Sequence, residues 1–201
     1  MADKNSLTER ERRRGRENSP QKERELIEKM RRRAALAEDR EQMAEATGVA
    51  DYEVLEALQE LGYTAMTIRL MPIVPLVQVA WAEGGVTPKE RKLLLEIAEA
   101  REILPSTPAH DQLLEWLEHE PPQEFYDDTL HGLHLLLHAI PDDLREASRE
   151  SLVEYCMQIA EVSGGILGFG RVSSDERELI ARIATEIGES REAAVKSLID
   201  E

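Results

Sequence analysis

Residues 77–90 read VQVAWAEGGVTPKE, which describes the end of one helix, a tight turn and the start of the next helix. The pair Gly84-Gly85 stops the first helix, because glycine adopts a positive φ at little cost. Thr87 is an N-cap residue and Pro88 takes the favoured first helical position. Glu90 follows the cap by three residues, where its side chain completes a capping box. The stretch therefore predicts a helical hairpin.

The same pattern recurs later in the chain. Residues 157–160 read MQIA and precede a second glycine pair, and residues 172–179 read VSSDEREL against VTPKERKL at residues 86–93. Ser173 and Glu176 form the second predicted capping box. The second copy carries an insertion at residues 166–171. We interpret the two copies as hairpins that pack face to face.

The rest of the chain also reads as helices. Apolar residues recur at three- and four-residue spacing, and runs that alternate at period two are nearly absent. Gly62 and Gly188 are expected to end helices, Thr64 to cap a helix that prolines split, and Ser190 to cap a terminal helix. The sequence predicts one all-α domain of seven to eight helices over residues 46–201.

Charge separates the N-terminal segment from this domain. The whole chain has a formal net charge of −16, yet residues 1–36 hold 12 basic and 7 acidic side chains. The segment has almost no large apolar side chains, so we expect residues 1–45 to form a charged arm that is partly helical or disordered. The basic clusters at residues 12–16 and 31–33 leave open a role as a tether for an acidic protein or for RNA.

Composition narrows the classes of function. The single cysteine, Cys156, excludes an internal disulfide framework and a cysteine-based zinc site. The acidic balance argues against nucleic-acid binding outside the arm. The sequence shows no secretory signal and no apolar run of membrane-spanning length, so we expect a cytoplasmic protein without a membrane span. Because no catalytic motif is present, we expect a protein that binds a protein partner rather than an enzyme.

The residues AWAEGGVTPKE at positions 80–90 resemble the Ala-Asp-Gly-x-Val-x-x-x-Glu signature of the TerB-like, tellurite-resistance-associated domains. The resemblance covers roughly residues 65–190. It implies an all-α, internally duplicated fold and a non-enzymatic binding or scaffold role linked to tellurite or chemical stress.

The family's acidic residues, which are suggested to bind a metal ion, carry over in part. Glu83 stands where the family has Asp, and Glu90 matches the family's Glu. In the second copy Ser163 replaces the first acid, and only Glu176 matches. Oxygen ligands of this kind favour Ca²⁺ or Mg²⁺.

A stripe of histidines offers a different metal hypothesis. His131, His134 and His138 lie at helical spacing with Asp127, and His134 and His138 have the i, i+4 spacing of a helical chelate. Three imidazoles and one carboxylate would suit Zn²⁺, and a hydrolase would need an open coordination position. The structural alternative is a row of half-buried histidines that border the apolar face of their helix.

Overall fold

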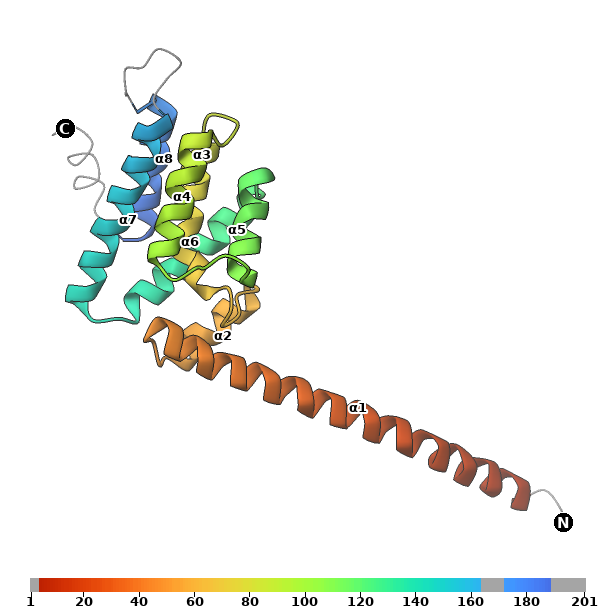
Figure 1. Cartoon of the computed structure of the whole chain (residues 1–201). Helices are drawn as coiled ribbons and strands as arrows, with labels where there is room; N and C mark the ends of the chain where they lie inside the picture. The colour runs from red at the N-terminus through yellow and green to blue at the C-terminus, as the bar shows by residue number, and fades with distance from the viewer. Residues whose placement is uncertain (1–3, 164–171, 189–201) are drawn as a thin grey trace. The chain divides into compact units, whose positions relative to one another are not determined.

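The computed structural model describes residues 4–163 and 172–188 of the chain. In these residues all regular structure is helical: there are eight α-helices, and one short 3₁₀ helix lies between the second and the third (Figure 1). The sequence-based prediction of an all-α chain is therefore confirmed for this part. The second glycine pair, the insertion at residues 166–171 and the helix predicted from Ser190 lie outside the described residues. The elements are α1 (Lys4–Thr47), α2 (Tyr52–Glu60), η1 (Ile68–Ile73), α3 (Val74–Trp81), α4 (Pro88–Ala100), α5 (Pro108–Glu118), α6 (Gln123–His138), α7 (Asp142–Ser163) and α8 (Ser174–Glu186).

The chain divides into two units, residues 1–41 and 42–201. Most of α1 makes up the first unit. From residue 21 to residue 38 its side chains are exposed, including Leu26, Ile27 and Met30. Glu28 pairs with Arg32 at 3.4 Å. The two residues are four positions apart, and oppositely charged pairs at this separation stabilise a solvent-exposed helix. Helix α1 ends at Thr47, so its last residues belong to the second unit.

A group of four helices forms the centre of the second unit. Helix α3 packs against α7 and α8, α4 packs against α7, and α7 also packs against α8. Figure 1 shows these helices running side by side. Their facing positions are aliphatic and fully buried, as at Leu76, Leu94, Ile159 and Ile180. Helix α6 covers this group by packing against α3, α7 and α8, and it carries α2 on another side.

The local signals for helix ends predicted several boundaries correctly. Thr87 and Ser173 both cap their helices through complete capping boxes. Gly62 and Gly188 follow α2 and α8 with φ of +88° and +92°, the left-handed conformation that glycine tolerates best. These ends depend on contacts within a few residues, which is why the sequence shows them.

Two boundaries differ from the prediction. Helical structure begins at Ile68 as a 3₁₀ turn instead of at Thr64, because the Thr64 backbone N–H donates to Thr67 Oγ1 in a local turn. Helix α4 ends at Ala100, before the predicted end near Leu104, because Glu102 adopts a left-handed φ of +63°. Pro72 lies within η1 and Pro75 in the first turn of α3, so the prolines change the helix type without separating the two elements. Among the described residues no helix is both long and apolar enough to cross a membrane.

Candidate functional site

The two capping-box glutamates are the most buried acidic side chains of the described core. Glu90 and Glu176 are 2% and 1% exposed. Glu90 Oε2 accepts the backbone N–H of Thr87 at 2.6 Å, and Glu176 Oε2 accepts that of Ser173 at 2.7 Å. Each carboxylate therefore has a structural role at the start of its helix, as the capping-box spacing predicts.

The structure also brings three of the predicted acidic positions into electrostatic contact. Burial raises the pKa of Glu90, and repulsion from Glu176 and Glu83 raises it further, while the hydrogen bonds to Thr87 oppose the shift. Glu83 itself is exposed, at the turn after α3. In the described part of the chain, however, no group of three or more His, Cys, Asp or Glu side chains is arranged to hold a metal ion. The three carboxylates thus do not fit direct coordination of one ion by all of them.

The histidine stripe lies along α6, with each member in a different environment. Asp127 is exposed and accepts a hydrogen bond from Gln123 Nε2 at 2.8 Å. His131 is exposed, whereas His134 is half-buried. The rings of His134 and His138 are 4.1 Å apart, and His138 Nδ1 lies 3.0 Å from the backbone oxygen of His134. The structure therefore brings His134 and His138 together but does not join the whole stripe into one ligand set.

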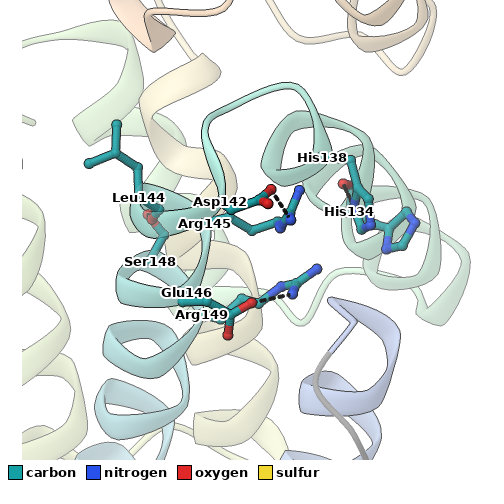
Figure 2. Close-up of polar contacts among 8 residues, drawn as sticks. All are labelled: His134, His138, Asp142, Leu144, Arg145, Glu146, Ser148 and Arg149. Carbon is teal, nitrogen blue, oxygen red and sulfur yellow. Dashed lines mark hydrogen bonds and ion pairs between the residues drawn. The ribbon is translucent and has the colours of Figure 1, made fainter.

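The surroundings of His134 are positively charged. Burial lowers the pKa of His134, the neighbouring His138 and Arg149 lower it further, and a hydrogen bond to the backbone of Glu186 opposes them. Figure 2 shows Arg145 and Arg149 of α7 extending toward the face of α6 that carries the two histidines. A cationic environment of this kind repels a divalent metal ion and attracts an anion. The sequence reasoning missed both arginines, although their i, i+4 spacing in the first turns of α7 was visible.

A second feature that the sequence did not indicate is a groove of about 720 Å³ on the second unit. Its aliphatic wall comes from the end of α6 and the beginning of α7, with further residues from η1, the end of α1 and the segment after α4. Leu144 lies at the edge and is 55% exposed. Arg69 and Glu102, which form an ion pair, and Arg101 give the groove a charged rim. The apolar wall consists of Leu133, Leu136, Leu137, Ile140, Leu144 and Leu152.

Cys156 is fully buried on α7, and burial raises the pKa of its thiol to about 12. A thiol in this state is a poor nucleophile, because the reactive form is the thiolate.

Comparison of the chain with protein-family models, with curated proteins and with solved structures gave no match.

Proposed function

We propose that this chain is a non-enzymatic binding protein of the scaffold type, which takes an amphipathic helical segment of a protein partner into the groove between α6 and α7. The observation that carries the proposal is the combination of many aliphatic side chains with the charged residues Arg69, Arg101 and Glu102 in the lining of one groove. The TerB-like resemblance of residues 80–90 supports the same class of function. The same resemblance implies a link to tellurite or chemical stress.

The chemistry of the groove selects the kind of partner. Aliphatic side chains from two neighbouring helices offer sites for leucine-like anchors at i and i+4 of a docking helix. Exposed apolar surface such as Leu144 loses contact with water when such a helix docks, at about 25 cal/mol per Å² of apolar area. Arg69, Arg101 and Glu102 lie where the polar edge of the incoming helix would pass. The polar rim would then fix the orientation of the bound segment.

The test uses a fluorescent amphipathic Leu–Lys model peptide, about four helical turns long, and measures its anisotropy as the protein is added. The buffer contains about 0.15 M salt, because at a Debye length of ~8 Å the attraction of a basic peptide to an acidic protein is largely screened. We expect Leu144→Asp to weaken binding by at least about tenfold, since a buried charge would face the apolar side of the peptide.

The matched control is Leu104→Asp. Leu104 is 50% exposed, close to the value for Leu144, but it does not line the groove. Unchanged affinity in Leu104→Asp together with the loss in Leu144→Asp supports the proposal. Equal effects of the two variants, or no binding by the wild type, would contradict it.

A divalent cation near Glu83, Glu90 and Glu176 is a second candidate function. Burial is the main cause that raises the pKa of Glu90, and the repulsion from Glu176 and Glu83 that adds to it favours this candidate. A cation near the three groups, held without direct coordination by all of them, would relieve that repulsion. Ca²⁺ and Mg²⁺ are the ions that oxygen ligands favour.

A further inference from the structure

Four nitrogen-bearing side chains converge where the end of α6 meets the beginning of α7 and the end of α8. His134 and His138 come from the last turns of α6, and Arg145 and Arg149 come from the first turns of α7 (Figure 2). Gly188, just after α8, lies against them: a Cβ at this residue would be 2.4 Å from Arg149 Nη2 and 3.6 Å from His138 Cε1. The position of this Cβ is therefore within 3.6 Å of a side-chain atom of α6 and of a side-chain atom of α7.

The two arginines are removed from water more completely than the carboxylates that pair with them. The side chains of Arg145 and Arg149 are 19% and 6% exposed. Their partners on the same helix, Asp142 and Glu146, are 87% and 60% exposed. Because an exposed carboxylate is solvated and screened, it neutralises a buried guanidinium incompletely.

Several nitrogens in this cluster have no hydrogen-bond partner in the described residues. They are Nε of Arg145, Nε of Arg149 and Nδ1 of His134, all buried. A buried polar group left without a partner costs about 1–3 kcal/mol, and more if it is charged. The two guanidinium Nε–H groups are always donors, and His134 Nδ1 becomes one when the ring is protonated, so this cluster would stabilise an acceptor with several oxygens.

We propose that His134, His138, Arg145 and Arg149 form a binding site for a small tetrahedral oxyanion of the phosphate class. The two guanidinium groups supply charge and N–H donors, and the imidazoles supply donors when they are protonated. This site is separate from the groove and does not depend on the function proposed above.

The geometry favours an oxyanion over a monovalent ion such as chloride. Guanidinium N–H groups match oxygen acceptors in a fixed planar arrangement, and an anion with several oxygens can accept from more than one helix at once. Burial is the main cause that lowers the pKa of His134, and the bound anion would offset the positive charge of His138 and Arg149, which lowers it further. The carboxylates of Asp142 and Glu146 would remain on the solvent side, each bound to its own arginine.

The experiment is a calorimetric titration of the full chain with inorganic phosphate, with phosphoserine, and with sodium chloride at matched ionic strength. We expect saturable heat with phosphate or phosphoserine and none with chloride. Preference for inorganic phosphate assigns the site to a free anion, whereas preference for phosphoserine assigns it to a phosphate ester on a larger molecule. Both results support an oxyanion site.

The variants locate the binding. Arg145→Gln removes a partly exposed guanidinium and should weaken phosphate binding by about tenfold or more, since a charge-assisted contact is lost. Arg145→Lys, which retains the charge, should recover part of the affinity. The control Arg91→Gln removes a different arginine, paired with Glu118 at 3.4 Å, and should bind like the wild type. A thermal melt confirms that each variant is folded.

The proposal is overturned by any of three results: no saturable heat with either phosphate compound, equal heat with chloride, or binding that Arg145→Gln and Arg91→Gln affect alike.

Discussion

Gly188 lies directly against the guanidinium of Arg149, so that a Cβ at residue 188 would be 2.4 Å from Nη2 and 3.1 Å from Cζ. Residue 188 also has a φ of +92°. Glycine therefore meets two demands here: it adopts the left-handed conformation that ends α8, and it leaves space for a buried side chain of α7. The packing of α8 on α7 depends on both.

Substitution of Gly188 by alanine should lower the free energy of unfolding by about 2–3 kcal/mol. The backbone cost is about 1–2 kcal/mol, and the added Cβ must also displace the end of the Arg149 side chain, which is 6% exposed and has little room to move. Gly62→Ala is the matched control, since Gly62 has a φ of +88° and nothing within 4 Å of its Cβ position. That variant should show the backbone cost alone. Urea denaturation measures both, and equal losses would show that the Arg149 side chain moves aside at no cost, contrary to this prediction.

The buried hydroxyl pair Tyr63 and Thr129 should behave as a coupled unit. Tyr63 Oη and Thr129 Oγ1 are 2.7 Å apart in the core between α2 and α6. Tyr63→Phe should cost about 1–2 kcal/mol, since the Thr129 hydroxyl loses its partner in a buried position. The double variant with Thr129→Val should cost less than the sum of the single variants, because both polar groups are then removed. Strict additivity in a double-mutant cycle would show that the hydrogen bond contributes nothing.

The raised pKa of Glu90 gives a pH dependence of defined sign. Below the ordinary value of 4.5 the group is protonated in the folded and unfolded states, so its ionisation has no effect on stability. As pH rises through the folded pKa, the unfolded state releases its proton more readily, and this group's contribution to stability falls. Glu90→Gln retains an acceptor for the cap N–H and removes the charge.

Glu90→Gln should therefore be more stable than the wild type at pH 7, and the difference should shrink as the pH falls toward 4.5. Thermal melts across this range measure the difference. Glu99→Gln, at an exposed position on α4, is the control and should show no such trend. A difference that grows as the pH falls would contradict the assigned sign.

The metal hypotheses predict distinct shifts in thermal melts of chelator-treated protein. An ion at 100 times its dissociation constant should add about 2.7 kcal/mol to stability. For the acidic positions, the shift should come from Ca²⁺ or Mg²⁺ and disappear in Glu83→Gln but not in Glu99→Gln. For the histidine stripe, it should come from Zn²⁺ and disappear in His134→Ala. No shift with any of these ions would contradict both hypotheses.

The sequence predicted those features of the fold that depend on neighbouring residues. Thr87 and Glu90 are three residues apart, so their capping box follows from local geometry. The glycine after α8 was predicted as a helix end for the same reason. Its contact with Arg149 was not predicted, because it depends on how α8 packs against a helix that begins 46 residues earlier.

The candidate sites show the same limit. The sequence placed His134 and His138 on one face of a helix, and the structure retains that spacing. The sequence could not show that Arg149 lies near His134 and His138, and the proposed anion site depends on this long-range contact. The groove was not predicted. The periodicity of α6 and of α7 indicates an apolar face on each helix, but it does not show that residues of the two helices line one groove.

The central claim, that the groove between α6 and α7 receives an amphipathic helix, is tested most directly by methyl NMR during titration with the Leu–Lys peptide. We expect the methyl signals of Leu136, Ile140 and Leu144, which line the groove, to shift and saturate together. The signals of Leu104 and Leu179, which lie outside it, should stay in place. Shifts centred on Leu104 or Leu179, or no saturable shift at the groove, would contradict the claim.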